Sequence, residues 1–219
     1  MDTKIKTGTT TVGVMCTDGV IIAAEKRSTA GGMIVISEDS EKIIIADKHV
    51  AFAAAGGAGD ADALGRMLSV EMRLYRMREG RPMTVDAAVS LLQNILYQYK
   101  FMPFYVGIIM GGVEADGTPK LVIIDPAGAV IPVKDTTAFG GSGWPAAQAV
   151  LDDLYEKGTI AETIPIVARA INSAKKRDTA SGGGIDVIAI TKDGIRKYKP
   201  EEVERILEKS RESKERKRK

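Results

Sequence analysis

The stretch VGVMCTDGVIIAA, residues 12–24, decides how the chain begins to fold. It contains two short apolar runs, Val12–Cys16 and Val20–Ala24, which are joined through Asp18-Gly19. An Asp-Gly pair adopts the backbone dihedral angles of a tight turn at little cost, so it favours a β-hairpin when apolar runs flank it. The sequence therefore predicts that the domain opens with two antiparallel strands.

Beyond this hairpin, strands and helices are predicted in separate blocks. Further strands are predicted at Met33–Ile36, Ile43–Ile45, Val50–Ala55, Tyr105–Gly112, Lys120–Ile124, Ala129–Val133, Thr136–Phe139, Ile185–Thr191 and Ile195–Tyr198. Apolar residues at helical spacing predict helices over residues 64–75, 85–99 (with Thr84 as its cap), 146–155 and 164–174, and a last helix opens at Pro200. Because the blocks do not alternate strand by helix, the sequence predicts an α+β domain of antiparallel sheets with helices outside them.

Composition narrows the possible chemistry. The 219 residues are 44% apolar and 27% charged, which is typical of one globular domain. No apolar run approaches the ~18 residues of a membrane span, and the N-terminal MDTKIKTG lacks the apolar stretch of a secretory signal. The single cysteine, Cys16, allows no internal disulfide, and we expect a cytoplasmic protein. With one cysteine and one histidine the chain cannot build a Cys/His zinc site, and His49, at the start of an apolar run, is interpreted as structural.

The C-terminal segment 208–219, EKSRESKERKRK, is strongly basic. It holds seven Lys/Arg and three Glu, so that the rest of the chain carries a net charge of −2. Basic tails can bind nucleic acid or acidic partners. This one has no interleaved aromatic residues for stacking on bases, and the remaining chain is slightly acidic. We interpret the segment as a solvated helix end and expect no nucleic-acid partner.

The segment KTGTTTVG, residues 6–13, contains the first candidate for chemistry. Cleavage between Gly8 and Thr9 would give Thr9 a free α-amino group, whose reference pKa of about 8 lies far below that of a lysine. Such an amine can accept the proton of the hydroxyl of the same residue, which makes a threonine nucleophilic without histidine. A threonine-rich start of a strand would have the same sequence, and this segment alone leaves both interpretations open.

Three further segments could serve such a nucleophile. The ammonium of Lys42 would stabilise an alkoxide and lower the proton affinity of the amine, and Glu25 would keep that lysine charged and oriented. The glycines of AGGAGD, residues 55–60, would let backbone N–H groups approach a substrate, as an oxyanion hole requires. This loop fits neither the Walker nor the dinucleotide pattern, and a calcium-loop match fails at Leu64. Taken singly, Lys42 and Glu25 could also be surface charges, and the glycines could also belong to an ordinary turn.

The last candidates lie in GGSG, residues 140–143, and in KRDTASGG, residues 176–183. Both segments fall at junctions between strands and helices, where polar side chains can converge on a site. Ser142 is not the serine of a nucleophile elbow, because Trp144 stands where that motif needs glycine. Ordinary capping and turn formation remain an alternative for each segment.

Together these segments resemble the archaeal-type proteasome β-subunit family. TGTTTVG at 7–13, AAEKR at 23–27, AGGAGD at 55–60, GGSG at 140–143 and KRDTASGGGIDV at 176–187 come in the order of that family and near its spacing. The resemblance extends from Thr7 to about residue 207. It implies the four-layer αββα sandwich of N-terminal-nucleophile hydrolases, with residues 1–8 as a propeptide removed by self-cleavage, 9–207 as the domain and 208–219 as a basic C-terminal tail.

The resemblance also implies a role for each matching residue. Thr9 is the nucleophile and, through its amine, the base. Lys42 is its charged neighbour and Glu25 the partner of that lysine; Gly56 supplies the oxyanion N–H; Ser142, Asp178 and Ser181 surround the amine; and Thr29 binds the substrate backbone. In this sequence itself, Ala53, Ala54 and Ala58 near Gly56 suggest a roomy, uncharged specificity pocket. The segment between Thr29 and Lys42 is one residue longer than in some relatives, which leaves Glu41 as an alternative to Lys42. Lys42 is preferred because an apolar strand follows it directly.

The function implied by the resemblance is that of a threonine-type endopeptidase acting on unfolded polypeptides through an acyl-enzyme, without metal or cofactor. The expected partners are other β-subunits in a heptameric ring, flanking proteasome α-subunits and a regulatory ATPase; no membrane is expected. A non-catalytic β-type ring subunit is the main alternative, although the complete set of site residues argues against it. The second alternative is another N-terminal-nucleophile hydrolase, such as a bacterial two-ring protease or a small-amide hydrolase.

Overall fold

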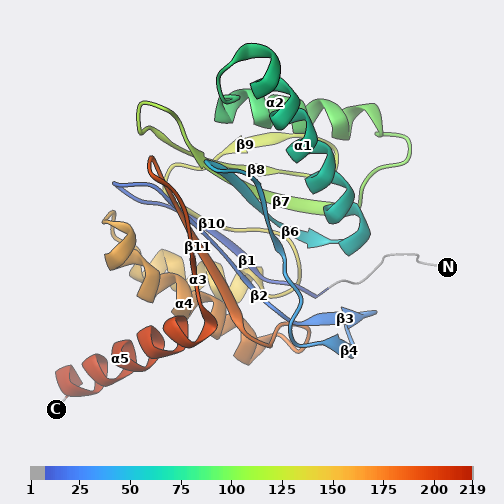
Figure 1. The fold of residues 1–219 in the computed structure, drawn as a ribbon. Helices are drawn as coiled ribbons and strands as arrows, with labels where there is room; N and C mark the ends of the chain where they lie inside the picture. Colours follow the sequence, from blue (N-terminus) through green and yellow to red (C-terminus); the bar gives the residue numbers. More distant parts are fainter. Residues whose placement is uncertain (1–7, 219) are drawn as a thin grey trace.

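The computed structural model describes residues 8–218 and the side chains of residues 8–210. The expected propeptide, apart from Gly8, and the side chains of most of the basic tail lie outside the described residues. Within them, the chain forms two five-stranded antiparallel sheets, one short two-stranded ribbon and five helices (Figure 1). The predicted α+β class with antiparallel sheets is therefore confirmed.

The first sheet has the strand order β10-β1-β2-β11-β12. Its strands are β1 (Thr11–Met15), β2 (Val20–Glu25), β10 (Thr136–Ala138), β11 (Ile185–Thr191) and β12 (Gly194–Tyr198). The predicted hairpin at Asp18-Gly19 is confirmed, because Met15 pairs with Val20 and the Cys16 N–H donates to the Gly19 carbonyl at 2.8 Å. This hairpin places the end of β2 beside the segment that precedes β1.

The second sheet has the strand order β5-β6-β7-β8-β9. Its strands are β5 (Ile43–Asp47), β6 (Val50–Gly56), β7 (Val106–Val113), β8 (Pro119–Ile124) and β9 (Val130–Pro132). The link between the sheets contains a separate ribbon, β3 (Ser28–Ala30) with β4 (Ile34–Ser37). The sequence predicts β4 but not β3, because Ser-Thr-Ala lacks both an apolar run and a clear alternation.

The helices are α1 (Ala58–Glu79), α2 (Val85–Gln98), α3 (Trp144–Leu154), α4 (Ile160–Arg177) and α5 (Pro200–Arg218). Thr84 caps α2 as predicted, since its hydroxyl accepts from the Ala87 N–H at 3.2 Å. Helix α4 begins four residues before the predicted Ile164, because Thr159 and Glu162 form a capping box in which each side chain accepts from the backbone N–H of the other.

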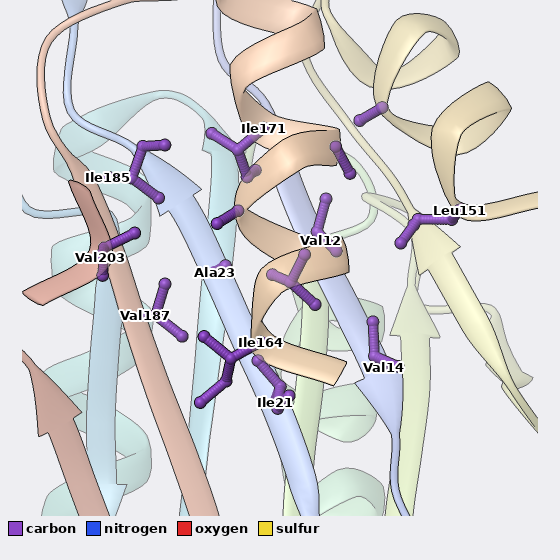
Figure 2. Close-up of a cluster of buried hydrophobic side chains, with 14 of the residues drawn as sticks. Val12, Val14, Ile21, Ala23, Leu151, Ile164, Ile171, Ile185, Val187 and Val203 are labelled. Carbon is purple, nitrogen blue, oxygen red and sulfur yellow. The ribbon is translucent and has the colours of Figure 1, made fainter. Parts of the chain in front are cut away.

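Three clusters of buried apolar side chains form the core. One joins the first sheet to α3, α4 and α5, and Figure 2 shows Ile21 and Ala23 of β2 beside Ile164 and Ile171 of α4. A second joins the second sheet to α1 and α2. The third contains residues of both sheets, among them Val20 and Ile22 of β2. Alternate residues of β2 therefore pack on opposite faces of the sheet, as the two-residue period of a strand requires.

Cys16 belongs to the first cluster and is 1% exposed. Burial raises the pKa of its thiol to about 11, against the opposing effect of a hydrogen bond with Thr163. Because the thiolate is the reactive form, we expect native protein at pH ~8 to react with iodoacetamide at least about 100-fold more slowly than protein unfolded in guanidinium chloride. Mass spectrometry of the labelled chain measures both rates, and similar rates would contradict the burial of Cys16.

Candidate active site

The candidate site lies where the ends of strands from both sheets meet. Thr9 stands two residues before β1, and β2 ends at Glu25. In the second sheet, Lys42 immediately precedes β5 and β6 ends at Gly56. Two antiparallel pairings, of Thr11 with Ala24 and of Ile43 with Ala53, fix these strand ends relative to each other within each sheet.

The buried carboxylate of Glu25 accepts four hydrogen bonds. It is 0% exposed and accepts backbone N–H bonds from Thr10 at 3.2 Å, Arg27 at 2.8 Å and Gly182 at 2.9 Å. It also accepts from the Lys42 Nζ, which forms an ion pair with it. Three backbone donors and one ammonium compensate for the loss of hydration that burial of a carboxylate costs. Glu25 thus joins the segment after Thr9, the end of β2, the loop before β11 and the start of β5.

Lys42, the partner of Glu25, is held by two acceptors. Its side chain is 10% exposed, and besides Glu25 its ammonium donates to the Arg27 carbonyl at 2.5 Å. Burial lowers the pKa of this ammonium, while the negative charges of Glu25 and Asp178 oppose that shift. The contact with Glu25 is made by Lys42, and the alternative residue Glu41 is exposed. The site therefore holds a cationic side chain in a mostly buried position, paired with Glu25.

Thr9 is 4% exposed, and its peptide bond to Gly8 is part of the described chain. Its hydroxyl donates to the Gly8 carbonyl oxygen, and its own carbonyl accepts from the Gly143 N–H at 3.3 Å. Gly8 and Gly141 are needed on steric grounds. An ideal Cβ on Gly8 would lie 1.9 Å from the Cβ of Ala180, and one on Gly141 would lie 2.0 Å from the Thr9 carbonyl oxygen. Loops on both sides therefore fix the backbone of Thr9.

The three predicted polar residues form one cluster. Asp178 accepts at the same carboxylate oxygen from Ser142 at 2.7 Å and from Ser181 at 2.6 Å. The hydroxyl of Ser181 lies 2.8 Å from that of Thr10, the residue after Thr9. Sequence reasoning missed Thr10, because nothing in a run of three threonines shows which of them contacts a segment 171 residues away.

The predicted oxyanion and substrate residues lie in β6, at the start of α1 and in β3. Gly56 has a φ of +140°, and an ideal Cβ there would lie 2.0 Å from the Tyr105 carbonyl oxygen, so only glycine fits. Ala54 is 6% exposed and belongs to the core beside α1 and α2, whereas Ala58 opens α1 and is exposed. The Thr29 hydroxyl is buried and has no hydrogen-bond partner among the described residues.

The remaining sequence expectations concern metals, membranes and His49. Among the described side chains, those of residues 8–210, the structure contains no group of three or more His, Cys, Asp or Glu residues placed to hold a metal ion. None of the helices in this part of the chain is both long and apolar enough to cross a membrane. His49 lies in the turn between β5 and β6, with its Nε2 at 2.7 Å from the Met83 carbonyl, and this contact has the structural character that the sequence predicts.

Known proteins similar to this chain align with most of its length. The family described as "Proteasome subunit" matches residues 5–190. A proteasome subunit beta of Archaeoglobus fulgidus is 44% identical over 213 residues, which cover 96% of this chain and 98% of that protein. A protein of the same name from Ferroglobus placidus is 44% identical over 209 residues (95% and 98%), and one from Methanohalophilus mahii is 43% identical over 203 residues (92% and 95%). With a family match over most of its length and relatives of one kind aligned almost end to end, the chain belongs to the proteasome subunit family and is of the β type.

Proposed function

We propose that the chain is a catalytic β-subunit of a proteasome core particle, a threonine-type endopeptidase whose nucleophile is Thr9. The observation that carries the proposal is the set of contacts made by Thr10, the residue that follows Thr9. Its backbone N–H donates to Glu25 of the buried Lys42–Glu25 pair, and its hydroxyl contacts Ser181 of the Asp178 cluster. The three core clusters further support the four-layer αββα arrangement of an N-terminal-nucleophile hydrolase, with two sheets packed face to face between helix pairs.

Self-cleavage would prepare the nucleophile. The hydroxyl of Thr9, which contacts the Gly8 carbonyl, attacks the carbonyl carbon of Gly8, and the bond from that carbon to the Thr9 nitrogen breaks as an ester to the hydroxyl oxygen forms. The nitrogen takes up the proton that the hydroxyl loses. Water then hydrolyses the ester, which releases residues 1–8 with a carboxylate at Gly8 and leaves Thr9 with a free amine and hydroxyl.

Peptide hydrolysis would use the same groups. The Thr9 amine accepts the hydroxyl proton as the oxygen attacks the substrate carbonyl carbon, and the Gly56 N–H stabilises the resulting oxyanion. The amine then gives its proton to the leaving nitrogen, and an acyl-enzyme remains on Thr9. Water attacks this ester, its proton passes through the amine, and the product carboxylic acid leaves. The nearby Lys42 ammonium favours the neutral form of the amine and the negatively charged oxygen.

The wider setting is part of the proposal, and membership of the proteasome subunit family supports it. The subunit would assemble into heptameric rings of β-subunits in the cytoplasm, with α-subunit rings on either side and a regulatory ATPase that delivers unfolded polypeptides. Burial of the active threonines inside such a particle would supply the selectivity that a small site lacks. The uncharged Ala58 is exposed at the start of α1 near Gly56 and favours cleavage after apolar residues, whereas Ala54 is part of the core. Equal rates after acidic and basic residues would argue against that preference.

The test is the intact mass of the chain co-expressed with its α-subunit. We expect the assembled particle to contain a chain that lacks residues 1–8, and we expect Thr9→Ala to keep them. Thr9→Ser, which retains a hydroxyl in the same place, is the matched control and should still be processed. A full-length wild-type chain inside an assembled particle would contradict the proposal and favour a structural ring subunit.

A further inference from the structure

Arg27 lies two residues after Glu25, outside the set of residues to which the proposed mechanism gives a role. Its guanidinium bonds to two different segments at once. The Nε lies 3.1 and 3.2 Å from the two carboxylate oxygens of Glu38, and one Nη lies 3.0 Å from that carboxylate. The other Nη donates to the Thr179 carbonyl at 2.8 Å. One planar group therefore connects the segment that leads to Lys42 with the loop between α4 and β11.

The backbone of Arg27 contacts the candidate site directly. Its N–H donates to Glu25 at 2.8 Å and is also within 3.1 Å of the Gly182 carbonyl, while its own carbonyl accepts from the Lys42 ammonium at 2.5 Å. A shift of this backbone would move an acceptor of Lys42 and a donor to Glu25 together. The side chain thus anchors a residue whose main chain holds the buried ion pair in place.

Two glycines allow the loop to pack directly on this arginine. An ideal Cβ on Gly182 would lie 2.3 Å from the Cζ and Nε of Arg27. Gly183 has a φ of +68°, and an ideal Cβ there would lie 2.2 Å from the Glu38 carbonyl oxygen. Residues at these two positions must therefore lack a side chain for the arginine–glutamate pair to sit where it does. The contact is built into the loop that carries Asp178 and Ser181.

Stability alone does not account for this arrangement. The side chains of Arg27 and Glu38 are 25% and 51% exposed, and ion pairs so open to solvent contribute little to the free energy of unfolding. What an arginine adds is geometry, because its rigid fork directs donors at a carboxylate and a carbonyl along fixed lines, whereas a lysine offers a point charge. The pair is therefore suited to setting the distance between two segments.

We propose that Arg27 is a positioning residue, whose guanidinium holds the segment before Lys42 against the loop that carries Asp178 and Ser181 and so fixes the two halves of the site around Thr9. This inference rests on the proposed function. It assigns no contact with substrate to Arg27. A change in its side chain should therefore affect the rate of the chemical step and leave substrate affinity nearly unchanged.

The experiment compares Arg27→Lys, Glu38→Gln and the double variant, each co-expressed with the α-subunit. An apolar fluorogenic peptide gives kcat and KM, and kcat is divided by the fraction of processed chain found by mass spectrometry. We expect each single variant to lower this kcat about 10-fold, with KM changed less than about 2-fold, because small misplacements of catalytic groups act on the rate. The double variant should lose no more than either single one, because both remove the same contact.

Arg196→Lys is the matched control, since the exposed Arg196 pairs with the partly exposed Glu202 at 2.7 Å and has no hydrogen bond or ion pair with the site residues. The proposal is overturned if Arg27→Lys keeps the kcat of this control, if the losses of the two single variants simply multiply, or if KM rises in place of a fall in kcat. Should Arg27→Lys fail to assemble, Glu38→Gln decides alone: a normal kcat overturns the proposal. A wild-type particle that neither processes its chain nor cleaves the peptide would instead refute the proposed function.

Discussion

Replacement of Lys42 by methionine is expected to lower the kcat of the assembled particle by about 10³-fold, the upper end of the range for loss of a group that stabilises charge in a transition state. Methionine has nearly the length of lysine without its charge. In the wild type the ammonium is held in a mostly buried place by Glu25 and by the carbonyl of Arg27. Its removal takes away the positive charge that favours the neutral Thr9 amine in peptide hydrolysis. Self-cleavage should fail as well, because the same charge would stabilise the Thr9 oxygen as it attacks the Gly8 carbonyl carbon.

The control for this variant is Lys48→Met. Lys48 is exposed in the turn at the opposite end of β5, so the same chemical change there should leave kcat within about 2-fold of the wild type, as is usual for exposed positions. Processing is followed by intact mass, and peptidase activity is followed with a fluorogenic peptide, both on assembled particles.

After the loss of Lys42, Glu25 keeps three backbone donors, so its carboxylate remains hydrogen-bonded. A Lys42→Met particle with wild-type activity would refute the role assigned to this lysine.

The second large effect is expected from Gly141→Ala. Gly141 has a φ of +75°, and its new methyl carbon would lie 2.0 Å from the carbonyl oxygen of Thr9. Backbone rather than a flexible side chain blocks the methyl group, so Thr9 itself must move. A displacement of about 1 Å is enough to lower a rate about 100-fold, and we expect at least this loss in processing and in peptidase activity.

Gly117→Ala separates this clash from the general cost of the backbone conformation. Gly117 also has a positive φ, +92°, but an ideal Cβ there meets no atom within 4 Å. It should therefore show only the strain of an alanine in that region, about 1–2 kcal/mol in the free energy of unfolding, with normal processing. Equal processing of the two variants would show that the loop around Gly141 does not constrain Thr9.

The sequence was informative wherever the cause of a structure is local. Asp18-Gly19 determines a hairpin through its own backbone preferences, and Thr84 caps a helix that begins at the next residue. Helix α4 was predicted too short because its apolar face was followed and the capping pair Thr159 and Glu162 was not. Each of these signals is contained within a few residues. The turn and the Thr84 cap were therefore predicted without tertiary information, and the capping box of α4 could have been predicted in the same way.

Side chains that contact distant segments were harder to predict. The resemblance to a family, more than any spacing, brought Glu25, Lys42 and Asp178 together, and it left Lys42 and Glu41 to be distinguished. The roles of Thr10 and Arg27 were missed, because their partners Ser181 and Thr179 lie more than 150 residues away. Neither residue type is unusual in its local sequence, so only the folded chain shows which groups they bind.

The site is assembled from segments that are far apart in the sequence, and this determines when the protein can become active. Thr9 is held by Gly143 and packed by Gly141, and the carboxylate that anchors its neighbour receives an N–H from Gly182. A nascent chain lacks the complete set of these contacts until residue 182 has been synthesised and the loop before β11 has packed against the end of β2, so under the proposed function it carries no competent nucleophile for most of its synthesis. Release of residues 1–8 would then mark each molecule that has completed folding, and a misfolded subunit would remain inert toward its neighbours in the cell.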